Sequence, residues 1–134
     1  MSRAGMIGLS GGGMVTLYTS ALEDRLRASV VSGYFCQFQR SILAMFHCDC
    51  NYVPGMLKWF ECADLAGMIA PKPVLFEAGT EDPIFPLEGV REAYAVAERV
   101  YGLLGIEDRL ELDVFPGEHQ WHGQRAWEFL QKWV

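Results

Sequence analysis

The chain has 134 residues, 51% of them hydrophobic, and a formal net charge of −6 at pH 7. This length and composition predict one globular domain over residues 1–134. Lys and Arg are spread along the chain rather than clustered, and the charge is acidic, so we expect no nucleic-acid partner and no anionic membrane partner. The sequence holds no run of 18 apolar residues and its first residues lack a signal-peptide pattern, which favours a cytoplasmic protein.

Strand-like and helix-like segments alternate along the chain. Short apolar segments that end at turn residues predict strands at 3–9, 27–34, 73–78 and 110–115. Apolar residues at helical spacing predict helices at 12–22, 87–104 and 121–134. The region 36–68 is aromatic-rich and less regular, with a turn at 51–55. This order predicts an α/β fold with a mostly parallel sheet of about four strands, helices on both faces and ligands beyond the carboxyl ends of the strands.

The first turn carries a serine in the pattern G-x-S-x-G, from Gly8 to Gly12. This pattern between a strand and a helix places a serine on a sharp turn, where a side chain on either outer glycine is expected to collide with the strand or the helix. We therefore predict Ser10 as a nucleophile and the N–H of Gly11, at the helix start, as an oxyanion donor. A glycine-rich loop of purely structural use is the alternative; a phosphate loop would need a following Lys-Ser or Lys-Thr.

A serine nucleophile needs a base to take its proton, and three histidines are available. His119 directly follows the last predicted strand, at the same sheet edge as Ser10. His122 lies where the final helix is expected to begin, and His47 falls in the irregular region. Position and chain order favour His119 as the base.

The base in turn needs a carboxylate to orient it. Asp82 lies just past the third predicted strand and completes the chain order Ser, Asp, His. Its neighbour Glu81 could substitute, and further acidic alternatives are Asp64, Asp108 and Asp113. Since all three predicted residues follow strand ends at one edge of one sheet, we expect Asp82 to be the acid.

Two further groups of residues have a functional and a structural interpretation. Aromatic residues could line an acyl pocket or pack in the core: Tyr34, Phe35, Tyr52 and Trp121. Four cysteines, Cys36, Cys48, Cys50 and Cys62, lie close in sequence, with His47 beside the single C-x-C. A zinc site usually has a second close pair of ligands, so we interpret them as free thiols and expect no metal and no cofactor.

Four segments resemble a known family: GMIGLSGGG at 5–13, GTEDPIFP at 79–86, GEHQW at 117–121 and CDCNYVPG at 48–55. Together they resemble the C-terminal half of α/β-hydrolases of the dienelactone hydrolase and acetyl xylan esterase-like group. The resemblance implies an esterase with Ser10, Asp82 and His119 as its triad. It also implies that a first half normally precedes the serine and supplies a second oxyanion N–H, so this fold is minimal or truncated.

The resulting hypothesis is a serine hydrolase that cleaves small carboxylic esters through an acyl-enzyme. A related peptidase stays open, as does a non-catalytic half-domain or fragment that acts in assembly or binding. The segment 3–9 is apolar and would form an unprotected sheet edge, so we also expect a homo-oligomer, a dimer or larger.

Overall fold

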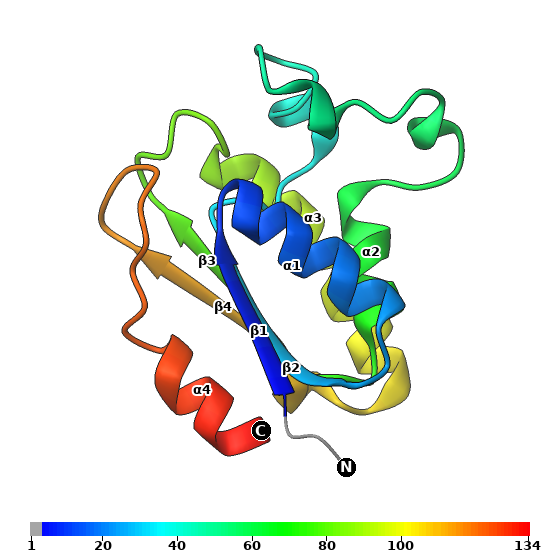
Figure 1. Ribbon diagram of the computed structural model, residues 1–134, viewed down its shortest axis with the longest axis vertical. Coiled ribbons are helices and arrows are strands. Elements are labelled where there is room, and N and C mark those ends of the chain that lie inside the picture. Colours follow the sequence, from blue (N-terminus) through cyan, green and yellow to red (C-terminus); the bar gives the residue numbers. More distant parts are fainter. Residues whose placement is uncertain (1–3) are drawn as a thin grey trace.

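The computed structural model describes residues 4–134, which form a four-stranded parallel sheet in the order β1-β2-β3-β4 (Figure 1). The strands are β1 (Ala4–Leu9), β2 (Leu26–Ser32), β3 (Val74–Gly79) and β4 (Leu110–Phe115). The predicted α/β class and all four predicted strands are confirmed; Arg3, the first residue of the first predicted strand, lies outside the described residues. β2 ends two residues early because Gly33 adopts a φ of +53°, which turns the chain out of the sheet.

Helices cover both faces of the sheet, as predicted (Figure 1). One face packs against three helices, α1 (Gly11–Leu22), α2 (Cys62–Ile69) and α3 (Leu87–Leu104). The other face packs against α4 (Ala126–Trp133) through Phe129, which joins Val30 and Leu75 in a second core. Every residue of β3 is buried, so any polar side chain on this strand needs a partner inside the protein.

Helix α2 was missed by the sequence prediction, which left residues 36–68 irregular. Its start is fixed by a capping box: the Glu61 carboxylate accepts from the Cys62 N–H, and Asp64 accepts from the Glu61 N–H at 2.8 Å. The rest of this region is indeed irregular. It forms three short 3₁₀ helices that lie beyond the carboxyl ends of the strands, at Phe38–Arg40, Asp49–Asn51 and Met56–Lys58 (Figure 1).

The last helix begins at Ala126, five residues later than the predicted start at residue 121. Gly123 adopts a φ of +72°, which a continuous helix does not allow, and its N–H is donated to the buried carboxylate of Glu77 at 2.9 Å. Residues 116–125 therefore form a loop that returns over the ends of β3 and β4. No helix among residues 4–134 is long and apolar enough to cross a membrane.

Candidate active site

Ser10 occupies a strained turn between β1 and α1. Its φ of 56° and ψ of −116° make it the one non-glycine residue with positive φ in the described part of the chain. Such a conformation costs about 1–3 kcal/mol and persists where surrounding contacts enforce it. Here the Ser10 N–H is donated to the Ser32 carbonyl at 2.9 Å, while the Ser10 carbonyl accepts the Met14 N–H that begins α1.

The glycines around Ser10 differ in whether the structure has room for a side chain at their position. A Cβ on Gly8 would overlap the backbone of Gly12, and a Cβ on Gly13 would lie 2.7 Å from the Ser32 carbonyl oxygen. A Cβ on Gly12 itself would meet no atom within 4 Å. The expectation that both outer glycines of the motif avoid a collision is therefore correct for Gly8 and wrong for Gly12. The close helix–strand approach depends on Gly8 and Gly13.

Asp82 and His119 meet at the carboxyl edge of the sheet, as the sequence predicted. Asp82 Oδ2 lies 2.8 Å from His119 Nδ1, and Asp82 Oδ1 accepts the N–H groups of Ile84 and Phe85 at 2.8 and 2.9 Å. The Asp82 side chain is 2% exposed. Gly79, at the end of β3, has no Cβ to keep the incoming Gly117 backbone away. Both oxygens of the acid are thus engaged, which fixes the carboxylate and the imidazole together.

Several contacts place His119 close to the serine turn. Nε2 of His119 is buried and has no hydrogen-bond partner among residues 4–134. A Cβ built on Gly33 would lie 3.0 Å from His119 Cε1 and 3.1 Å from Leu9 Cδ1, so the imidazole and the residue before Ser10 flank the same point. Phe85 stacks on His119 at 5.6 Å between ring centroids, and it lines the same pocket as Ser10.

The pocket at Ser10 has a volume of about 280 Å³. Gly11, the predicted oxyanion donor, and Tyr34, a predicted pocket aromatic, also line it; the Tyr34 hydroxyl donates to Asn51 Oδ1 at 3.0 Å. The opposite wall comes from the segment between β2 and α2 and includes His47, Cys48 and Cys50. The pocket is therefore bounded by the serine turn on one side and an irregular segment on the other.

The other predicted pocket aromatics lie elsewhere. Phe35 is buried in the core and stacks on Phe76 at 3.8 Å between centroids, so its predicted role in lining the pocket is wrong. Phe35 lies three residues after the end of β2 and packs in the core between the sheet and α1, α2 and α3. Tyr52 lines a different cavity, described below, and Trp121 lies partly exposed over Gly123 in the loop after His119.

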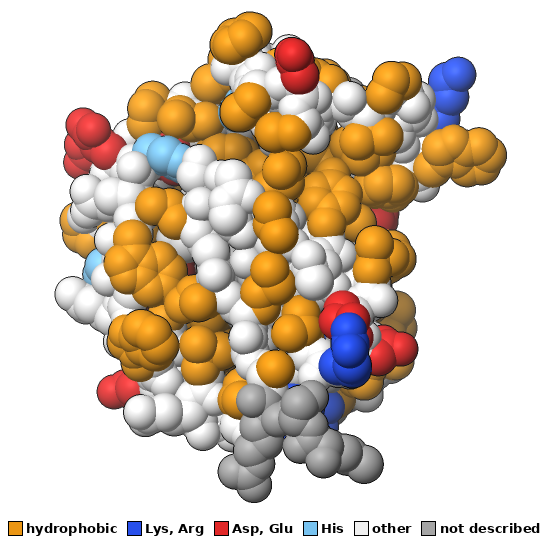
Figure 2. Space-filling model, viewed as in Figure 1, with side chains coloured by type: hydrophobic (Ala, Val, Ile, Leu, Met, Phe, Trp, Pro, Cys, Tyr) orange, Lys and Arg blue, Asp and Glu red, His pale blue; other side chains and the backbone are white. Residues whose placement is uncertain are grey.

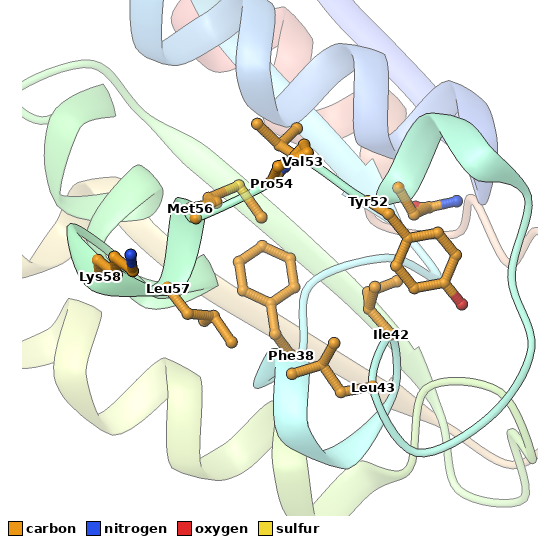
Figure 3. A pocket seen from close by; sticks show the side chains of 11 residues that line it. Phe38, Ile42, Leu43, Tyr52, Val53, Pro54, Met56, Leu57 and Lys58 are labelled. Atoms are coloured by element: carbon orange, nitrogen blue, oxygen red, sulfur yellow. The ribbon is translucent and has the colours of Figure 1, made fainter.

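A second, larger cavity of about 450 Å³ lies within the irregular segment (Figure 3). Its walls are mostly apolar and include Phe38, Ile42, Tyr52 and Met56. Ser10 does not line it, but Asn51 lines both cavities, so the two are neighbours.

The loop that carries His119 also carries His122, which forms a second histidine–carboxylate pair. His122 Nδ1 lies 3.0 Å from Asp113 Oδ2, and Phe115 stacks on the His122 ring at 4.3 Å between centroids. Glu77 lies opposite Asp113 in the register of β3 and β4. Burial raises the pKa of Glu77, and the nearby Asp113 raises it further. In the sequence, Asp113 and His122 were only alternatives for the triad; the available signal was a carboxylate inside each of two predicted strands, Glu77 in β3 and Asp113 in β4.

The four cysteines are free thiols. Cys36 and Cys62 are buried, and burial raises the pKa of Cys36 to about 12. Cys48 and Cys50 are exposed at the pocket wall. Within residues 4–134, three metal-ligating side chains come together only at Glu77, Asp113 and His122, away from the cysteines.

Comparison with known proteins supports the fold and a relationship to hydrolases. The chain is 31% identical over 140 residues to a Bacillus subtilis (strain 168) protein named "Putative hydrolase YtaP", and the match covers 98% of this chain and 46% of that protein. The chain thus spans about half the length of the curated relative that it matches. No protein-family model matches it.

Solved structures agree with this relationship at the level of fold. A carbohydrate esterase family 15 glucuronoyl esterase from Caldicellulosiruptor kristjansonii matches 95% of this chain and 41% of its own length, with a TM-score of 0.75 and 19% identity. The Pyrococcus furiosus esterase Pf2001 matches 98% of this chain and 53% of its own length, with a TM-score of 0.72 and 19% identity. The chain therefore has the architecture of part of an α/β-hydrolase fold, and it is related in sequence to a protein described as a putative hydrolase.

Proposed function

We propose that the protein is a serine hydrolase that cleaves carboxylic esters of small acyl groups, with Ser10, His119 and Asp82 as its catalytic triad. The observation that carries the proposal is a buried Asp82–His119 pair, with a free Nε2, beside a serine held at positive φ. A buried imidazole nitrogen without a partner is costly unless a ligand or a reacting group uses it.

In the proposed reaction, Ser10 Oγ attacks the ester carbonyl carbon while His119 Nε2 takes the hydroxyl proton. Asp82 accepts the Nδ1–H bond and stabilises the imidazolium that forms. The tetrahedral intermediate expels the alcohol, which receives the proton from Nε2. Water then attacks the acyl-serine with His119 again as base, and this step releases the acid and restores Ser10.

The developing oxyanion needs donors at the end of α1. The Gly11 N–H is the first backbone N–H of this helix, where four N–H groups have no partner within the helix and the dipole is positive. Gly11 also lines the pocket with Ser10. One lost oxyanion donor can cost about 10²–10³ in kcat, so the source of a second donor sets how active the protein is.

Covalent labelling tests the proposal directly. A fluorophosphonate probe is expected to add one phosphonyl group to Ser10, because it reacts with a serine only when a base activates the hydroxyl. Ser10→Ala should abolish the label. Ser29→Ala, which removes a buried hydroxyl of β2 that is hydrogen-bonded to Ser20 of α1, should keep it. Labelling that persists in Ser10→Ala would disprove the assignment.

A second candidate function is a non-catalytic unit that acts in assembly or binding. The match to about half of the relative's length supports it, since the resemblance implies that a preceding half supplies the second oxyanion donor. Under this candidate the wild-type protein takes no fluorophosphonate label although it is folded.

Self-association is part of the proposal. β1 pairs with β2 and lies at the edge of the described sheet, with α1 and α4 on either side of it (Figure 1). Figure 2 shows hydrophobic side chains running down the face that carries α1 and β1. Val15 and Leu22 on α1 and Trp127 on α4 are 49%, 75% and 62% exposed. An open apolar edge of this kind is commonly covered by a second copy in a two-fold dimer.

Light scattering at micromolar concentration tests this expectation. We expect a particle of at least twice the 15.1 kDa chain mass. Val15→Lys should shift the particle toward the monomer, because it places a charge in the contact. A stable wild-type monomer with full esterase activity would show that four strands suffice alone.

A further inference from the structure

A buried cluster outside the proposed triad has the composition of a cation site. Glu77, Asp113 and His122 each offer one ligand atom, and these atoms all lie within 4.8 Å of one another. Glu77 comes from β3 and Asp113 from the same register position on β4, so both side chains project from one face of the sheet. His122 closes the cluster from the loop that returns over the strand ends.

The two carboxylates of the cluster are buried without a Lys or Arg partner among the described residues. Glu77 is 2% exposed and Asp113 is 8% exposed, and among residues 4–134 neither carboxylate forms an ion pair with Lys or Arg. Buried carboxylates are normally paired with a cation or bound to a metal. The His122 imidazole contacts one oxygen of Asp113.

One oxygen of Glu77 is buried without a hydrogen bond of ordinary geometry. Glu77 Oε1 accepts the Gly123 N–H, whereas Glu77 Oε2 makes no such bond; the Ser32 hydroxyl, which is paired with Glu77 across β2 and β3, interacts with this carboxylate. A buried carboxylate oxygen with no partner costs free energy unless a ligand is bound there. This observation is independent of the spacing of the three residues.

We propose that Glu77, Asp113 and His122 bind a divalent transition-metal ion of the Zn²⁺ type. One imidazole with two carboxylates suits such an ion better than Ca²⁺ or Mg²⁺, which prefer oxygen ligands alone. Bonds of about 2.0–2.2 Å require the ligand atoms to approach one another by about 1 Å. His122 lies on a loop, so its side chain is the one that moves toward the two carboxylates. Stacking on Phe115 keeps the orientation of the His122 ring.

The ion joins β3, β4 and the loop that carries His119, so its role is structural. It lies on the two strands farthest from β1, and the proposal does not depend on hydrolysis at Ser10. Its binding is therefore measured without any substrate.

The test is calorimetric titration of chelator-treated protein with ZnCl₂. Because the exposed Cys48 and Cys50 could bind Zn²⁺ by themselves, the parent for all measurements carries Cys48→Ser and Cys50→Ser. We expect one ion per chain and a rise in melting temperature on adding Zn²⁺. Glu77→Gln keeps the shape and the acceptor for Gly123 but removes the charge, and it should abolish stoichiometric binding; His122→Ala should do the same.

Matched controls separate this cluster from the triad. His119→Ala removes a histidine three residues away and Ser10→Ala removes the proposed nucleophile; both should bind Zn²⁺ like the parent. Circular dichroism in metal-free buffer verifies that each variant is folded, and Asp113→Asn replaces any variant that is not. The proposal is wrong if the parent binds no Zn²⁺, if Glu77→Gln binds it as tightly as the parent, or if His119→Ala loses it.

Discussion

One loop carries two histidines that each pair with a buried aspartate, and the two pairs are nearly alike in geometry. His119 lies 2.8 Å from Asp82, and His122 lies 3.0 Å from Asp113, with both carboxylates buried. Their surroundings differ. The first pair leaves a free imidazole nitrogen near the serine turn, whereas the second faces another buried carboxylate, Glu77. A histidine–carboxylate pair alone thus does not define a function. The group next to the pair, the serine turn in one case and Glu77 in the other, is what distinguishes them.

Replacing each histidine by alanine is expected to give the largest difference in activity between the two pairs. We expect His119→Ala to lower kcat/KM for a short-chain p-nitrophenyl ester by roughly 10⁴–10⁶-fold, because the serine loses its base. His122→Ala should cost less than about tenfold, since it changes only the support of the loop. Both are measured in chelator-treated protein, so that bound ions do not contribute. The opposite ranking would make His122 the base.

The two aspartates provide the next contrast. Asp82→Asn keeps the shape but favours the wrong imidazole tautomer, so we expect a loss of about 10⁴-fold in kcat with little change in KM. Asp113→Asn should lower kcat by less than about tenfold. Steady-state kinetics of both variants measure these changes in kcat. Equal losses of kcat in the two variants would mean that the two pairs act as one network.

The aromatic rings that stack on the histidines give the smallest contrast. Phe85 stacks on His119 and Phe115 on His122. Such contacts contribute about 0.5–1.5 kcal/mol, so Phe85→Leu should lower kcat by about two- to tenfold. Phe115→Leu should lower the melting temperature instead and leave kcat within about threefold. A kcat loss confined to Phe115→Leu would contradict the distinction between the pairs.

Much of the fold was predictable because its strands are short apolar segments bounded by turns. All four strands, α1 and α3 follow directly from periodicity and from glycine positions. Helix α2 was not predictable in this way because its cap is a glutamate, Glu61, rather than a serine or threonine. The late start of α4 depends on a contact between Gly123 and Glu77, 46 residues apart, which no local pattern reveals.

The candidate site was predictable to a similar degree. Chain order and strand ends were enough to bring Asp82 and His119 together. They did not reveal which aromatics face the pocket, because Tyr34 and Phe35 are adjacent in sequence and point to different surroundings. Nor did they reveal the second cluster, since Glu77 and Asp113 meet only through the register of two parallel strands.

The irregular segment opposite Ser10 is held very differently from the sheet. Backbone hydrogen bonds of residues 49–60 connect only near neighbours, whereas β3 is paired on both sides. We therefore expect amide hydrogens in this segment to exchange with solvent deuterium far faster than those of β3, through local opening that needs no global unfolding. We expect one wall of the pocket to move away from Ser10 while Asp82 and His119 stay in place, so under the proposed function the largest ester accepted would depend on this opening rather than on the closed volume.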